Sequence, residues 1–396
     1  MSTPLVKETP PQLSAPKARI WTRDFTLICM SNFFIFLGFQ MTLPTIPLFV
    51  EQLGGNDQLI GLVVGIFTFS ALLARPFAGH SLESKGRRFV YLLGLAIFVL
   101  SVGSYGLITS LLFLFGFRII QGIGWGFSTT ASGTIATDLI PASRRGEGMG
   151  YFGLFGNLAL AFGPSLGLTL AGTISFTKLF SICAILGLVA LILSSRIHYK
   201  KRETVQKHTQ KWDFYEKTAL PPSILLFFIT VPFGGMAAFL PLYTVQKGIP
   251  GIEVYFLIFA IALMVSRTFA GRIYDTKGHR AVFGPGSLSI ALALVLLAWL
   301  PSSLVLYVAA FLYGLGFGAL QPALQAWAVQ SAPGNRKGMA NATFFSSFDL
   351  GVGIGAISFG QLAYFFGYQS IYITSALSVL ISILLYFTWI GKNKSA

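Results

Sequence analysis

Charged residues are scarce in this sequence of 396 residues, because only 10% are Asp, Glu, Lys or Arg, whereas soluble globular domains have about a quarter. Histidine is scarcer still. The four histidines, at positions 80, 198, 208 and 279, do not form a group that could bind a metal. The phosphate-binding pattern Gly-x-x-x-x-Gly-Lys-Ser/Thr is missing, which argues against ATP as the energy source. We therefore predict no metal, no cofactor and no enzymatic activity.

Hydrophobic residues, in contrast, make up 54% of the chain. They come in runs of about 18 to 25 residues, the length at which a helix crosses a hydrocarbon core of about 30 Å. The two cysteines, Cys29 and Cys183, lie inside such runs and are expected to be buried hydrophobic residues. We predict an all-α membrane protein with twelve transmembrane helices. Their expected ranges are 22–50, 57–80, 88–108, 111–138, 147–172, 176–196, 222–246, 253–274, 281–300, 303–331, 338–366 and 369–391.

The positive charge is concentrated in every second loop between these ranges. The 28 Lys and Arg residues exceed the 13 Asp and Glu residues by 15. Cytoplasmic loops of membrane proteins carry such an excess, so both termini and the central loop are expected in the cytoplasm. This distribution explains the net charge without a nucleic-acid partner. The basic positions include Arg19, Arg23, Lys85, Arg87, Arg88, Arg144, Arg145, Arg196, Lys200, Lys277, Arg280, Arg336, Lys337 and Lys392.

An internal repeat relates the two halves of the chain. Residues 74–90 and 266–282 are identical at eight of 17 positions, at an offset of 192. The same offset places Arg144 on Arg336 and Gly163 on Gly355. A register shared over so many residues predicts two six-helix bundles related by a pseudo-two-fold axis. The expected division is a disordered tail (1–20), an N-terminal bundle (21–197), a basic cytoplasmic linker (198–221), a C-terminal bundle (222–391) and a short tail (392–396).

The segment after the second predicted helix resembles a signature of the major facilitator superfamily, Gly-x-x-x-Asp-Arg-x-Gly-Arg-Lys. The resemblance covers almost the whole chain after residue 20 and implies the major facilitator fold. Glu83 replaces the usual Asp, and Ser84 replaces an Arg. By resemblance, the two copies form a conformational latch; a plain basic loop is the alternative. The latch residues would be Gly79, Glu83, Gly86, Arg87 and Arg88, with Gly271, Asp275, Gly278 and Arg280 in the second copy.

Two further segments resemble motifs of this family. Arg118 with Gly122 resembles an Arg-x-x-x-Gly motif of the fourth helix, which implies a role in proton coupling or anion contact. An arginine that extends to the membrane surface is the alternative. The fifth predicted helix resembles the glycine-rich motif of drug:proton antiporters, although Ala159 and Leu168 depart from it. The matching positions are Gly150, Gly163, Pro164 and Gly167.

Asp349 lies near the middle of the eleventh predicted helix, and its repeat mate is Asn157. Charged residues inside membrane spans are costly, so a carboxylate there is a candidate proton carrier. A structural acid between helices is the alternative, and the sequence leaves open whether Asp349 meets Arg118. Several other polar or aromatic residues are candidates for lining a central cavity, or alternatively for joining helices. They are Gln40, Gln121, Asn157, Gln321, Gln325 and Trp327.

These features together predict a secondary transporter of the cell membrane. The predicted activity is proton-coupled efflux of a small lipophilic or amphipathic compound by alternating access. A proton-coupled importer of a sugar or metabolite with the same fold is the alternative, and a membrane enzyme has much less support. The expected partners are the lipid bilayer, the cargo and protons, but not nucleic acid. We expect a monomer of bacterial origin.

Overall fold

The computed structural model describes residues 19–141, 144–199, 215–333 and 336–390. Within them, twelve helical segments are long and apolar enough to cross a membrane, as predicted. The first half contains α1 (Arg23–Gln52), α2 (Asp57–Ser84), α3 (Arg87–Ser104), the 3-10 turn η1 (Tyr105–Leu107), α4 (Leu111–Leu139), α5 (Arg145–Ala171) and α6 (Phe176–Ser195). The second half contains η3 (Lys217–Ala219), α7 (Leu220–Gln246), α8 (Ile252–Trp299), α9 (Ser303–Gln330), α10 (Lys337–Phe366), α11 (Tyr368–Leu385) and η4 (Tyr386–Ile390).

The long helix α8 contains two membrane spans, Ile252–Tyr274 and Thr276–Trp299. The helix kinks at Gly278, in the first turn of the second span, where the backbone has φ 74° and ψ 178°. Its repeat mate Gly86 caps α3 with φ 88° and ψ 160°. A positive φ of this kind favours glycine. Both copies of the repeat therefore use glycine to make the same sharp turn between two spans.

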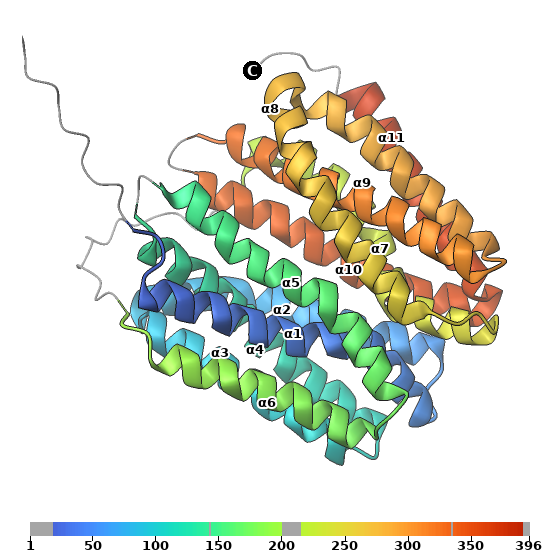
Figure 1. The fold of residues 1–396 in the computed structure, drawn as a ribbon, viewed down its shortest axis with the longest axis horizontal. Helices are drawn as coiled ribbons and strands as arrows, with labels where there is room; N and C mark the ends of the chain where they lie inside the picture. Colours follow the sequence, from blue (N-terminus) through green and yellow to red (C-terminus); the bar gives the residue numbers. More distant parts are fainter. Residues whose placement is uncertain (1–18, 142–143, 200–214, 334–335, 391–396) are drawn as a thin grey trace, which may run out of the picture.

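The helices form two bundles that lie side by side, with α1–α6 in one and α7–α11 in the other (Figure 1). Between the bundles, α2 packs on α10, α5 packs on α8, and α1 packs on α7. By the offset of 192, α2 corresponds to the first span of α8, and α10 corresponds to α5. The two main contacts between the bundles are thus the same contact made twice, as a pseudo-two-fold axis requires.

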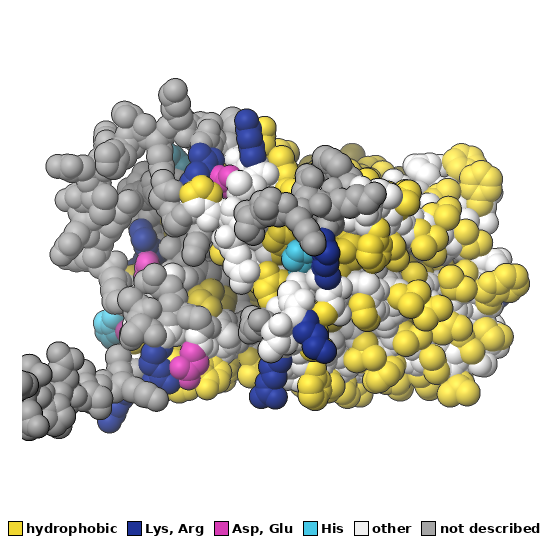
Figure 2. Space-filling view, turned by 90° about the horizontal axis from the view of Figure 1, so that it is seen from above, with side chains coloured by type: hydrophobic (Ala, Val, Ile, Leu, Met, Phe, Trp, Pro, Cys, Tyr) yellow, Lys and Arg dark blue, Asp and Glu magenta, His cyan; other side chains and the backbone are white. Residues whose placement is uncertain are grey.

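Charge divides the molecule into two ends. The end that carries the turns at Gly86 and Gly278, and the starts of α1, α5 and α10, is called the basic end; the other is called the opposite end. Figure 2 shows the Lys and Arg side chains of the visible face gathered toward one end and hydrophobic side chains over the remainder. The first tail and the linker were predicted at 1–20 and 198–221; residues 1–18 and 200–214 lie outside the described residues, as does the tail 392–396.

At the opposite end, α2 and α10 approach each other backbone to backbone. A Cβ added to Gly61 would lie 2.4 Å from the carbonyl oxygen of Ala356 and 3.0 Å from the Cα of Gly360. Nearby, Gln58 Nε2 donates a hydrogen bond to Gln361 Oε1 over 2.6 Å. The Tyr368 hydroxyl donates to Asp57 Oδ1 over 2.8 Å. These contacts join the bundles at the opposite end.

Candidate functional site

An ion pair joins the two bundles near the middle of the membrane spans. Arg75 Nε on α2 lies 2.9 Å from Asp349 Oδ2 on α10, and the two side chains are 26% and 16% exposed. Arg75 Nη1 also donates to Thr129 Oγ1 on α4 over 3.4 Å. Asp349 is twelve residues into α10, which places it about 18 Å along the helix. The pair therefore lies deep in the membrane spans, and both of its side chains are partly exposed.

A second arginine makes the equivalent contact from the second bundle to the first. Arg267 Nη1 on α8 donates to Asn157 Oδ1 on α5 over 2.7 Å. Its Nη2 donates to Gln321 Oε1 on α9 over 2.5 Å. The offset of 192 relates Arg75 to Arg267, Asp349 to Asn157, and Thr129 to Gln321. The same three-residue arrangement thus occurs twice, once with a carboxylate and once with an amide.

Sequence reasoning selected Asp349, Asn157 and Gln321 but missed both arginines. The signal was present, because Arg75 and Arg267 are identical positions of the repeat and both lie inside a predicted span. A charge kept in both halves at membrane depth indicates a shared function.

Arg118 lies inside the first bundle, away from Asp349. Its side chain is 1% exposed, so it does not extend to the membrane surface. Its Nε donates to the Val63 carbonyl oxygen over 3.1 Å and its Nη1 to Gln121 Oε1 over 2.6 Å. The guanidinium also lies over the Phe67 ring, 4.3 Å from its centre. Arg118 and Gln121 therefore form a buried polar cluster between α2 and α4.

The residues of the predicted latch lie at the basic end. Arg87 Nε on α3 lies 2.9 Å from Asp138 Oδ2 on α4, so this ion pair joins helices of one bundle. Added Cβ atoms at Gly79 and Gly271 would meet nothing within 4 Å, and Arg88 and Arg280 are exposed. The side chains of Glu83 and Asp275 lie outside the described residues.

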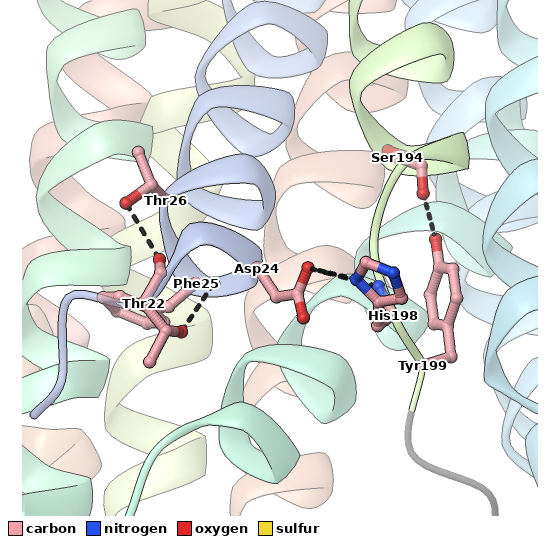
Figure 3. Close-up of polar contacts among 7 residues, drawn as sticks. All are labelled: Thr22, Asp24, Phe25, Thr26, Ser194, His198 and Tyr199. Carbon is pink, nitrogen blue, oxygen red and sulfur yellow. Dashed lines mark hydrogen bonds and ion pairs between the residues drawn. The ribbon is translucent and has the colours of Figure 1, made fainter. Parts of the chain in front are cut away.

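Other ion pairs at the basic end also join parts of a single bundle. Asp24 accepts a hydrogen bond from the backbone N–H of His198 over 3.2 Å and lies 3.3 Å from its ring Nδ1, as Figure 3 shows. In the second bundle, Glu216 pairs with Arg336. Hydrogen bonds from Thr218, together with Arg336, lower the pKa of the Glu216 carboxyl. Asp24 and Glu216 are repeat mates, so each bundle fixes the start of its first helix with a carboxylate.

The glycine motif of α5 brings this helix against α1. A Cβ at Gly163 would lie 2.4 Å from Cβ of Gln40, and one at Gly167 would lie 2.5 Å from the carbonyl oxygen of Met41. A Cβ at Gly150 would meet nothing within 4 Å. Pro164 lies inside α5. The glycines at 163 and 167 are therefore needed for close helix packing.

The remaining cavity candidates make contacts within one bundle. Gln40 is buried against α5, and its Oε1 accepts no hydrogen bond from the described residues. Gln325 Nε2 donates to Asn341 Oδ1 over 2.8 Å. Trp327 stacks on His279 with ring centres 4.1 Å apart. Of the six candidates, the structure places Asn157 and Gln321 at the contact between the bundles.

Each bundle also has an aromatic cluster. In the first, Trp125 stacks on Phe39 with ring centres 3.9 Å apart. In the second, Phe317 stacks on Phe233 at 5.3 Å and lies 6.3 Å from Phe348, the neighbour of Asp349. Trp125 and Phe317 are repeat mates. Trp125 and Phe317 each lie four residues, about one helical turn, before the Thr129 and Gln321 that bond to the two arginines.

Twelve membrane-spanning helices in two pseudo-symmetric bundles, with an ion pair between them at membrane depth, define a secondary transporter. The chain belongs to the Major Facilitator Superfamily, whose family profile matches residues 28–302 and 255–396. It is therefore a transporter and not an enzyme.

Comparisons with individual proteins agree with this assignment. The chain is 27% identical over 394 residues to the multidrug resistance protein MdtG of Citrobacter koseri, covering 93% of this chain and 95% of that protein. It is 25% identical over 360 residues to the staphylopine export protein of Staphylococcus aureus, covering 86% and 90%. Among solved structures, a nucleoside transporter (NupG, D323A variant) superposes with a TM-score of 0.79 at 14% identity, covering 93% of this chain and 100% of that chain.

Proposed function

We propose that this protein exports a small lipophilic or amphipathic compound in exchange for protons. The observation that carries the proposal is the Arg75–Asp349 ion pair, which joins the bundles at membrane depth. The basic end would face the cytoplasm, since Lys and Arg accumulate on that side of membranes. The opposite end, which the α2–α10 contact closes, would then face outward.

Asp349 is the proposed proton carrier. In the ionised form its carboxylate attracts the Arg75 guanidinium and holds α2 against α10. Protonation removes the negative charge, and a hydrogen bond to a neutral group is weaker than one to an ion. The lock between the bundles is then released, and the opposite end can open. An exchanger needs this behaviour, because the empty, deprotonated protein must not change conformation.

The proposed direction of transport rests on the α5 motif and on relatives. Gly163 and Gly167, which pack closely on α1, are positions of the predicted antiporter-type motif, and both named relatives are called resistance or export proteins. At ~100 mV, each proton that enters supplies about 2.3 kcal/mol, enough for more than tenfold accumulation of cargo. The aromatic clusters, which begin one helical turn from Thr129 and Gln321, suit a cargo with an apolar body.

The proposal is tested in proteoliposomes that contain a trapped pH indicator. The cargo panel is 1-naphthylacetate, 1-naphthylacetamide and 1-naphthylmethylamine, which differ in charge on a common ring. Wild-type protein is expected to move protons against the flow of at least one compound. Asp349→Asn is expected to move that compound down its gradient without protons, because no titratable group remains at the lock.

Asp138→Asn is the matched control, since Asp138 makes an ion pair of the same length within one bundle. It should retain proton exchange. Normal proton coupling in Asp349→Asn would refute the role of Asp349. Movement of cargo and protons in the same direction would instead support the importer.

A further inference from the structure

Arg267 has no acidic partner among the residues that the structure describes. Its Nη1 and Nη2 are bonded to the amide oxygens of Asn157 and Gln321, which are neutral. Its Nε is buried, and no acceptor in the described part of the chain bonds to it. Arg75, its repeat mate, has Asp349 at the corresponding place. Arg118 also bonds only to neutral groups, but it is enclosed within one bundle, whereas Arg267 is partly exposed between the bundles. A charge at this depth is costly unless it is paired, so the missing negative charge is expected to come from outside the chain.

The amides around Arg267 turn the site into a cluster of hydrogen-bond donors. A guanidinium only donates, so both amide oxygens must face it. Their NH₂ groups remain as donors, and neither bonds to another side chain among the described residues. A site that offers a guanidinium and two amide NH₂ groups, with its acceptors already used, matches the oxygens of an anion.

We infer that the cargo is a small organic anion, and that Arg267, Asn157 and Gln321 bind its carboxylate between the bundles. One uncompensated positive charge corresponds to one negative charge on the cargo. The aromatic cluster around Phe317 lies in the same bundle and would contact the apolar part of such a compound. The identification of this anion as the cargo rests on the proposed transport function, whereas the anion-binding site itself does not.

The repeat supplies the most informative variant. Asn157→Asp would give Arg267 the same acid that Asp349 gives Arg75, and would neutralise the site from within. Arg267→Gln would remove the charge itself. Either change should abolish the preference for an anion, although one adds a carboxylate and the other removes a guanidinium. Arg267→Lys keeps the charge and should keep part of the preference.

The experiment measures calorimetric binding of 1-naphthylacetate and 1-naphthylacetamide to protein in nanodiscs of uncharged lipid, with empty nanodiscs subtracted. Wild-type protein is expected to bind the carboxylate at least ~10-fold more tightly than the amide. Asn157→Asp and Arg267→Gln are each expected to weaken carboxylate binding by about 10- to 100-fold and to change amide binding by less than about twofold. Size-exclusion profiles and melting curves confirm that each variant is folded.

Equal affinity of wild-type protein for the two compounds, or failure to bind the carboxylate, would overturn the inference. So would a full carboxylate preference in folded Asn157→Asp. The binding measurement does not involve protons. A carboxylate preference without proton movement in proteoliposomes would therefore reject the proton exchange and retain the anion site.

Discussion

Gly61 offers a direct way to force the bundles apart at the opposite end. An added Cβ would lie 2.4 Å from the Ala356 carbonyl oxygen, where ordinary contacts begin at 3.4 Å. The neighbours are backbone atoms of α10, so no side-chain rotation can relieve the overlap, and the helices must separate by about 1 Å. Overpacking of this kind costs about 1–3 kcal/mol. Gly61→Ala should thus lower the ratio of closed to open protein by about 5- to 150-fold.

The assay is a distance measurement between spin labels at the opposite end. Lys178 and Lys247 lie there in different bundles and are exposed, while the natural cysteines, Cys29 and Cys183, are buried. Gly61→Ala is expected to shift the labelled protein toward longer distances. Gly116→Ala is the control, because an added Cβ at this helical glycine would meet nothing within 4 Å. Unchanged distances in folded Gly61→Ala would refute the account of closure.

Three further predictions concern stability. Gly167→Ala should lower the melting temperature through a loss of about 1–3 kcal/mol, because its Cβ would meet the backbone of Met41, whereas Gly150→Ala should be neutral. Tyr91→Phe should lower the free energy of unfolding by about 1 kcal/mol in a denaturation assay, because the buried Tyr91 hydroxyl is hydrogen-bonded to Ser31. Tyr313→Phe removes a buried hydroxyl that has no described partner and should not destabilise the protein. Because the pKa of folded Glu216 lies below its ordinary value of 4.5, its hydrogen bonds from Thr218 and its pair with Arg336 stabilise the protein above that pH, and this contribution is lost as pH falls through the lowered pKa. Glu216→Gln should therefore melt earlier than wild type at neutral pH, and the difference should close in acid.

The architecture was predictable because membrane thickness fixes helix length and the repeat fixes the symmetry. The lengths of the hydrophobic runs predicted all twelve spans, and the offset of 192 between the repeats paired Asn157 with Asp349 from the sequence alone. Even the turn at Gly278 follows from the glycine shared with the first half.

The contacts of the site were harder to predict, because sequence position gives the depth of a side chain but not its direction around the helix. Trp327 lies six residues after Gln321, which turns it to another side of α9, where it stacks on His279. Arg118 bonds to Val63 inside a bundle, whereas Asp349 bonds between the bundles to Arg75, which lies twelve residues, or about 18 Å, farther along α2. The docking of the bundles decides that Arg75 is the partner of Asp349, and no pattern within one helix encodes it.

Spin labels at positions 178 and 247 test directly whether protonation of Asp349 releases the bundles, as proposed. In wild-type protein the distance between labels should be short at pH 8 and should lengthen as the pH falls. Asp349→Asn, which imitates the protonated carboxyl, should show the long distance at every pH, whereas Asp138→Asn should titrate like wild type. If the distance between the labels in Asp349→Asn still became shorter as the pH rose from acid to alkaline, as in wild type, the proposed role of Asp349 would be contradicted.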